Sequence, residues 1–247
     1  MSEPIDQIDL TRGVEAVFPS LEALKERLAS GKGLTIYHGV DPTGPHLHLG
    51  HATNLLLLRR FQDLGHRIIF LIGDFTARIG DPTGKSAARS PLSAAEVRQN
   101  FSTFRRQAAK IIKFRGRNAA RMAWNSKWLS RLRLADLLKL MSQVTVQQMI
   151  ERDMFQARLK EGKPIWLHEF LYPLLQGYDS VALNVDAEIG GNDQTFNMLV
   201  GRDLLKSYRR REKFVIATKL LVNPKTGGKL MNKSEGGFIG LSDTPRD

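Results

Sequence analysis

Short apolar runs alternate with amphipathic helical segments along most of this 247-residue chain, and this alternation constrains the fold more than any other feature. The runs at 34–40, 67–73 and 213–221 have the length and the β-branched content of buried strands. Strands that alternate with helices favour a parallel sheet covered by helices on both faces. The sequence therefore predicts an α/β fold, with ligands at the carboxyl ends of the strands.

Local signals mark the ends of several elements. Gly65 is placed to end a helix over about 49–64. Two capping-box patterns, at Ser93 with Glu96 and at Thr145 with Gln148, begin further helices. The remaining expected elements are helices at 93–113, 134–141, 145–159 and 166–184, the last one interrupted by a proline, and strands at 121–125 and 185–190.

The composition excludes several classes of protein. Cysteine is absent, which rules out a disulfide framework, a thiol nucleophile and a cysteine-based zinc site. No run approaches the roughly 20 apolar residues that span a bilayer. The first ten residues lack the basic and apolar regions of a signal peptide. We therefore expect a cytoplasmic protein.

Positive charge is concentrated in two places. The chain carries 37 Lys and Arg residues against 25 Asp and Glu, and no acidic residue occurs from Val97 to Ala135. A second cluster, "YRRREK", covers 208–213. One such cluster alone is more often a solvated helix face, but two together favour a polyanionic partner such as nucleic acid.

The stretch "GDFTARIGDPTGKSAARS" ends like a phosphate-binding P-loop but departs from that motif. The Walker pattern requires a glycine at position 79, where this chain has Ile79. Pro82 also removes a backbone N–H donor that a phosphate cradle would use. We interpret this segment as a different kind of ligand loop.

Three of the six histidines, His46, His48 and His51, lie close together in "HLHLGH". His48 and His51 are three residues apart at the expected start of a helix, whose free N–H groups attract phosphates. Gly50 between them removes a side chain that would keep a flat ligand from the backbone. A nucleotide site is favoured, while a zinc site that includes Asp41 and a purely structural role stay open.

Several blocks together resemble one enzyme family. "HLGH" and "MNKS" are similar to the two signatures of class I aminoacyl-tRNA synthetases, whose short forms are HIGH and KMSKS. "YHGVDPTGPHLHLGH", "GDPTGK", "FLYPLLQGYDS" and "IGGNDQ" resemble the bacterial tyrosyl-tRNA synthetases, in the order of that family. The resemblance runs from about Tyr37 to Ser242 and implies a Rossmann-like catalytic domain with a helical connective insertion.

The resemblance implies a tyrosine site. Tyr37 and Asp179 match the pair that binds the phenolic hydroxyl group, and the other matches surround the amino and carboxylate groups. These others are Gly39, Asp41, Thr76, Asp81, Tyr172, Gln176 and Gln194.

It also implies an ATP site at the start of the first long helix and in the two signature loops. The matches to phosphate and ribose contacts are Thr43, His48, Gly50, His51, Gly191 and Asp193. The matches to cations and a hydroxyl beside the pyrophosphate are Lys85, Arg89, Lys233 and Ser234.

The implied reaction joins L-tyrosine to ATP, and the tyrosyl group then moves to the terminal ribose of tRNA(Tyr). Mg²⁺ is expected on the ATP phosphates, no zinc is expected, and the family implies a homodimer with 143–159 near the contact. Two alternatives remain: a tryptophanyl-tRNA synthetase, and a synthetase-derived RNA-binding module without activity.

The implied organisation has three parts. Residues 1–33 form an N-terminal helical segment, and 34–228 the catalytic domain with a connective region at about 125–165. Residues 229–247 form a mobile loop and the start of an anticodon-binding region. Leu230 departs from the family, because it stands where KMSKS has its first lysine.

Overall fold

A computed structural model describes residues 11–83, 91–223, 228, 230–231 and 239–244 of the chain. The strands are β1 Val14–Phe18, β2 Thr35–Val40, β3 Arg67–Ile72, β4 Arg121–Trp124, β5 Ala187–Gly191 and β6 Phe214–Thr218. The helices that surround the sheet are α1 Leu21–Ala29, α2 Leu49–Asp63, α3 Ala94–Phe101, α4 Phe104–Ala108, α9 Leu167–Leu183 and α10 Thr195–Arg209. Shorter pieces are η2 Thr76–Arg78, α5 Ser126–Leu129, α6 Leu134–Met141, α7 Val146–Ile150, α8 Asp153–Lys160 and η3 Asn192–Gln194.

The strands form one sheet in the order β1-β6-β5-β2-β3-β4. All neighbouring strands are parallel except β1, which pairs antiparallel with β6 at one edge. The predicted α/β fold with a largely parallel sheet is therefore confirmed, and the carboxyl ends of β2, β3 and β5 meet at one edge.

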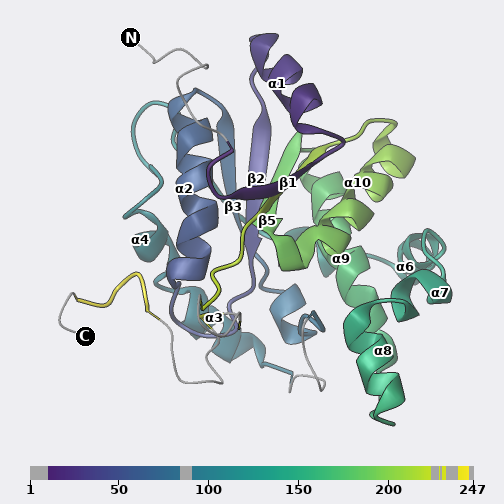
Figure 1. Ribbon diagram of the computed structural model, residues 1–247. Helices are drawn as coiled ribbons and strands as arrows, with labels where there is room; N and C mark the ends of the chain where they lie inside the picture. Colours follow the sequence, from purple (N-terminus) through teal and green to yellow (C-terminus); the bar gives the residue numbers. More distant parts are fainter. Residues whose placement is uncertain (1–10, 84–90, 224–227, 229, 232–238, 245–247) are drawn as a thin grey trace.

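Helices cover both faces of the sheet, with α2 on one side and α9 and α10 on the other (Figure 1). Alternate residues of β2 divide between the faces: Ile36 and Val40 join the core with Leu55, Leu58 and other residues of α2, as the period of two in a strand requires. Tyr37 points to the opposite face, toward α9. The sheet therefore places Tyr37 on the side that carries α9.

The described helices and strands differ from the sequence expectation in several places. The segment at 1–33 was expected to be helical, but it contains β1 as well as α1. The expected helix at 93–113 breaks into α3 and α4 at Ser102 and Thr103. Gln107 of α4 binds Pro45 O and Leu47 N of the loop before α2. The expected helix at 145–159 breaks at Arg152, which is extended and donates a hydrogen bond to Thr83.

Helix α9 is continuous through Pro173, where an interruption was expected. A proline inside a helix removes a single backbone hydrogen bond. Tyr172, Leu174 and Leu175 beside it are all buried, so tertiary packing holds the helix together at this point.

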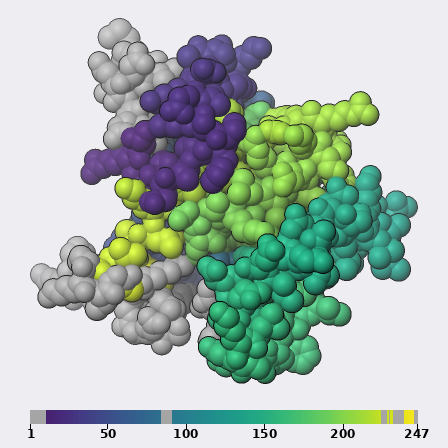
Figure 2. All heavy atoms as spheres, turned by 45° about the vertical axis from the view of Figure 1, so that its right-hand side comes forward, coloured from purple at the N-terminus to yellow at the C-terminus, as the bar shows by residue number. Residues whose placement is uncertain are grey.

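Helices α6, α7 and α8 form a lobe beside α9 and α10 (Figure 2). Several large apolar side chains of this lobe and of the start of α9 are exposed: Leu134, Leu138, Met141, Val146, Leu159, Trp166 and Leu167. None of the described helices has both the length and the apolar character needed to cross a membrane.

Candidate active site

A cavity of about 570 Å³ opens at the edge where β2, β3 and β5 end. This volume lies within the usual range for small-molecule sites. The structure brings all the described residues of the two expected ligand sites to its wall. They are Tyr37, Gly39, Asp41, Thr43, His48, Gly50, His51, Thr76, Asp81, Tyr172, Gln176, Asp179, Gly191, Asp193 and Gln194. Their individual roles stay predictions, and Lys85, Arg89, Lys233 and Ser234 lie outside the described residues.

The two histidines at the start of α2 are fixed by the helix end. His48 is the N-cap residue, and its Nδ1 accepts a hydrogen bond from Gly50 N at 3.1 Å. The Nδ1 atom of His51 accepts from His48 N at 3.1 Å. A neutral imidazole that accepts at Nδ1 carries its proton on Nε2. The second nitrogen of each neutral ring is therefore a hydrogen-bond donor.

Gly50 lines the cavity and also leaves room for the ring of His48. A Cβ atom at this position would lie 3.0 Å from that ring. At the opposite wall, Gly191 leaves room for the Asp193 carboxylate, which would lie 2.6 Å from a Cβ atom there.

A group of polar side chains surrounds Asp41 at the end of β2. Its Oδ1 accepts from Thr76 Oγ1 at 2.7 Å and its Oδ2 accepts from Tyr172 Oη at 2.9 Å. Nearby, Asp81 accepts a 2.7 Å hydrogen bond from Gln194 Nε2. Two carboxylates held at one wall suit a positively charged ligand group.

Asp179 of α9 lies at the inner end of the cavity. Trp128 Nε1 donates to its Oδ1 at 2.7 Å, and Asn125 Nδ2 donates to its Oδ2 at 3.2 Å. Burial raises the pKa of Asp179 well above its ordinary value, while the hydrogen bonds from Trp128 and Asn125 act in the opposite direction. A carboxylate has about four lone-pair positions, so Asp179 can accept one more hydrogen bond from a ligand.

Tyr37 lies beside Asp179 at the same end of the cavity and is buried. Its hydroxyl group is 3.0 Å from Ser180 Oγ. Burial is the main cause that raises the pKa of Tyr37, followed by the charges of Glu188 and Asp179. Tyr37 therefore stays a neutral phenol that can both donate and accept a hydrogen bond.

Sequence reasoning missed several residues that build this end of the site. Asn125 and Trp128 hold Asp179, and Glu188 of β5 lines the cavity. A glutamate inside an apolar strand was a signal that could have been used, because buried charges are rare unless they are paired. Gly73 was also missed: a Cβ atom there would be 1.9 Å from Asp41 Oδ1.

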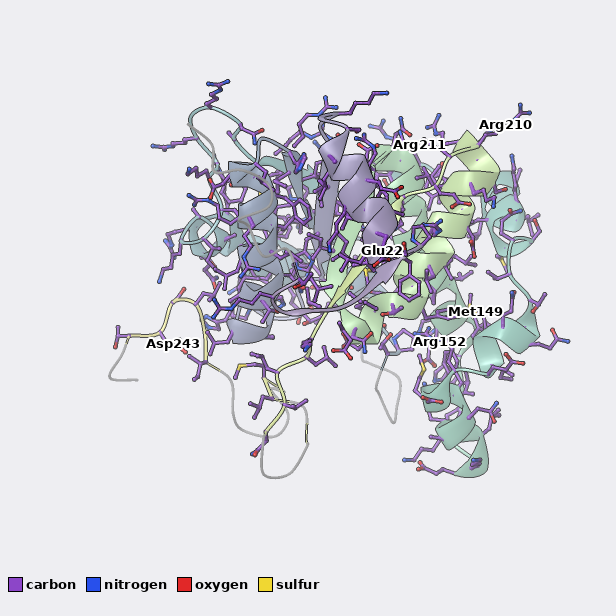
Figure 3. The ribbon with its side chains drawn as sticks, turned by 45° about the horizontal axis from the view of Figure 1, so that its top comes forward. Glu22, Met149, Arg152, Arg210, Arg211 and Asp243 are labelled. Atoms are coloured by element: carbon purple, nitrogen blue, oxygen red, sulfur yellow. The ribbon has the colours of Figure 1, made fainter. Side chains whose placement is uncertain are left out.

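The two basic clusters differ in the structure. All eleven cations between 97 and 135 are exposed. In the second cluster, Lys213 is buried and paired with Glu188, and Arg211 pairs with Asp186 at 2.5 Å. Arg210 and Arg211 follow the end of α10 (Figure 3). The prediction that Lys213 belongs to a phosphate-binding surface is therefore wrong, because its ammonium group is not exposed.

Clustered metal ligands are missing from the part of the chain that the structure describes. Within those residues, no group of three or more His, Asp or Glu side chains is placed to hold a metal ion.

Comparison with known proteins gives a consistent result. The family model described as tRNA synthetases class I (W and Y) matches residues 29–247. The tyrosine–tRNA ligase of Carboxydothermus hydrogenoformans is 46% identical over 252 residues, which cover 99% of this chain and 60% of that protein. The tyrosine–tRNA ligase of Legionella pneumophila strain Paris is 48% identical over 237 residues, which cover 96% of this chain and 58% of that protein. The chain thus spans about three fifths of the length of these relatives.

Solved structures agree in fold. The tyrosyl-tRNA synthetase of Archaeoglobus fulgidus, solved in complex with L-tyrosine, matches with a TM-score of 0.75 and 25% identity, over 96% of this chain and 69% of that chain. The mitochondrial tyrosyl-tRNA synthetase of Coccidioides posadasii matches with a TM-score of 0.73 and 28% identity, over 88% and 67%. The family match, the Rossmann-like sheet and the site at its carboxyl edge lead to one conclusion: this chain belongs to the class I tRNA synthetases of the tryptophan and tyrosine group.

Proposed function

We propose that the chain activates L-tyrosine with ATP, giving tyrosyl-adenylate and pyrophosphate, and passes the tyrosyl group to tRNA(Tyr). The observation that carries this proposal is the pair Tyr37 and Asp179 at the inner end of the cavity. A phenol both donates and accepts a hydrogen bond, and this pair offers a partner for each. The bound L-tyrosine of the Archaeoglobus fulgidus synthetase supports the same choice of substrate.

The rest of the cavity suits the other groups of the substrates. Asp41 and Asp81 lie where an ammonium group would be held, with Gln176 and Gln194 beside them. His48 and His51 at the start of α2 provide donors for the ATP phosphates. Mg²⁺ would accompany ATP, because phosphate oxygens are ligands that this ion prefers.

The activation step requires no nucleophile from the protein. An oxygen of the tyrosine carboxylate attacks the α-phosphorus of ATP, and the bond from that phosphorus to the bridging oxygen of pyrophosphate breaks. The protein contributes alignment of the two substrates and stabilisation of the charge that develops. Lys85, Arg89, Lys233 and Ser234 are proposed to contact the departing pyrophosphate.

Transfer to tRNA calls for a surface that binds an RNA backbone. The exposed cations between 97 and 133 are the best candidates in the described part of the chain. Such contacts position RNA without reading its sequence and weaken as salt rises.

We place this activity in the cytoplasm. We also propose that the catalytic domain covers residues 34–228 and that a separate loop covers residues 229–247.

We also propose a homodimer that uses the lobe of α6, α7 and α8. Leu138, Met141, Val146 and Leu159 expose apolar side chains there, which is costly unless another surface covers them. A monomer mass at micromolar concentration would contradict this part of the proposal.

Amino-acid-dependent exchange of pyrophosphate into ATP, measured with each of the twenty amino acids, tests the proposal. Tyrosine should support exchange with a far higher kcat/KM than any other amino acid. Tryptophan dependence would favour the tryptophanyl alternative, whose indole N–H needs only an acceptor. No exchange with any amino acid would favour an RNA-binding module.

A further inference from the structure

A buried ion pair lies directly behind Tyr37. Lys213, which precedes β6, and Glu188 of β5 form this pair, and their side chains are 0% and 4% exposed. The ammonium group of Lys213 also donates a 2.7 Å hydrogen bond to Ser180 Oγ and lies 5.5 Å from the centre of the Tyr37 ring. The Ser180 hydroxyl group therefore connects the ion pair to the phenol of Tyr37, and Glu188 also interacts with Tyr37.

The fold leaves space for this lysine where α9 and α10 cross. A Cβ atom on Gly201 of α10 would lie 2.8 Å from Lys213 Nζ and 3.0 Å from Ser180 Oγ. A Cβ atom on Gly177 of α9 would lie 3.0 Å from Gly201 N. Two glycines thus bring the helices close together and leave room for a charged side chain between them and the sheet.

The chemistry of the groups limits the possible directions of the hydrogen bonds. An ammonium group only donates, so Ser180 Oγ accepts from Lys213. The single hydroxyl hydrogen of Ser180 can go to Tyr37 Oη at 3.0 Å or to Glu188 Oε2 at 3.5 Å. The first contact has normal geometry and the second is at the limit for a hydrogen bond. The shorter contact favours Ser180 as the donor to Tyr37, and the hydrogen of Tyr37 is then available to a ligand or to Glu188.

We propose that Lys213 is a positioning residue for amino-acid selection: through Ser180 it orients the Tyr37 hydroxyl group as a hydrogen-bond donor to the phenolic oxygen of the substrate. Asp179 then accepts the substrate's own hydroxyl hydrogen. Glu188 keeps the buried ammonium group charged and in place. This inference rests on the proposed function, because it takes tyrosine as the ligand of this end of the cavity.

The test compares selectivity, defined as kcat/KM for tyrosine divided by kcat/KM for phenylalanine in pyrophosphate exchange. Lys213→Met in the full chain should lower this ratio about tenfold, because a disoriented Tyr37 no longer favours a substrate hydroxyl group. The KM for ATP should not change. Ser180→Ala should lower the ratio by a similar factor.

A second buried ion pair in the described part of the chain supplies a matched control. Arg158 and Glu169 are also buried, at 1% and 3% exposure, and neither lines the cavity. Arg158→Met removes a buried cation in the same way, so it should leave the selectivity ratio of the folded protein unchanged. A general effect of destabilisation would lower the ratio in both variants.

A double variant separates positioning from simple packing. Because Lys213 acts through Ser180, adding Lys213→Met to Ser180→Ala should lower the ratio no further. Full additivity, or an unchanged ratio in either single variant, would overturn the inference. If Lys213→Met does not fold, an unchanged ratio for Ser180→Ala still overturns the inference. Absence of tyrosine-dependent exchange in the unchanged chain would instead overturn the proposed function, and the inference with it.

Discussion

Two ion pairs among the residues that the structure describes are alike in burial and different in what surrounds them. Arg158 of α8 binds Glu169 of α9 through two contacts of 2.6 and 2.8 Å, and Glu169 also accepts from Trp166 N at 2.9 Å. This pair closes a loop of the lobe and contacts no ligand cavity. The pair of Lys213 and Glu188 joins β5 to the residue before β6 and lies against the sheet-edge cavity. The same kind of interaction thus serves the fold in one region and the site in the other.

The cations of the two pairs also differ in how firmly they hold their charge. The hydrogen bond to Glu169 raises the pKa of Arg158. Burial lowers the pKa of Lys213, although Glu188 acts in the opposite direction. An arginine in a two-contact pair is a rigid connection, whereas a buried lysine is a charge that depends on its partner. The arginine pair therefore suits a fixed connection within the lobe. The lysine pair suits a group of hydrogen bonds beside the cavity that depends on the charge of Lys213.

The largest effect is expected for Arg158→Met, which sharpens the comparison through stability. Removal of Arg158 leaves Glu169 charged, buried and without its cation, which typically costs about 3–5 kcal/mol. Urea denaturation followed by circular dichroism measures the loss. A loss below about 1 kcal/mol would show that this pair does not hold the lobe together.

Asp179→Ala is expected to have the next largest effect, on activity. The substitution removes the acceptor for a substrate hydroxyl group and leaves Trp128 and Asn125 without their partner. Tyrosine-dependent exchange should fall about a hundredfold, since a hydrogen bond to a charged group and its unpaired partners together cost about 2.7 kcal/mol. Circular dichroism should show an intact fold. If this variant activates tyrosine at the normal rate, Asp179 does not bind the phenolic hydroxyl group of the substrate.

These predictions depend on features that the sequence reveals to different degrees. The strand and helix alternation and the motif blocks were sufficient to predict the parallel sheet and the residues that meet at its edge. The residues that support the cavity wall from behind were not predictable. The contacts of Asn125 and Lys213 join segments that are 54 and 33 residues apart in the chain. Lys213 also lies within a basic run, so its sequence context suggested an exposed cation when the fold buries it.

A smaller effect, about tenfold, is expected at the start of α2. His48 both caps the helix and faces the proposed ATP phosphates, and His48→Asn separates these roles because asparagine is a good N-cap residue. His48→Ala, His48→Asn and His51→Ala should each lower kcat more than they raise KM for tyrosine. If His48→Asn keeps full activity, His48 only caps the helix and does not bind the ATP phosphates.

The smallest effect concerns pH and stability. His38 is buried and hydrogen-bonded to Ile189 O at 2.8 Å, and burial lowers its pKa from the ordinary value of 6.5. The folded protein therefore binds this proton less readily than the unfolded chain. The associated stability is complete above pH 6.5 and is lost as pH falls toward the folded pKa.

Thermal denaturation should show lower stability at pH 5.5 than at pH 7.5. His38→Leu should reduce this loss, while His66, whose pKa burial also lowers, retains part of it. Equal pH dependence in the variant and the unchanged protein would contradict the assignment to His38.

Direct binding of amino acids to the chain, without ATP or tRNA, tests the central claim that the sheet-edge cavity selects a phenol. Titration calorimetry should show one tyrosine bound per chain and no measurable heat with phenylalanine or tryptophan. Asp179→Ala should abolish the tyrosine signal, and Arg158→Met should retain it while the protein stays folded. Equal binding of tyrosine and phenylalanine, or tyrosine binding that survives the loss of Asp179, would contradict the account.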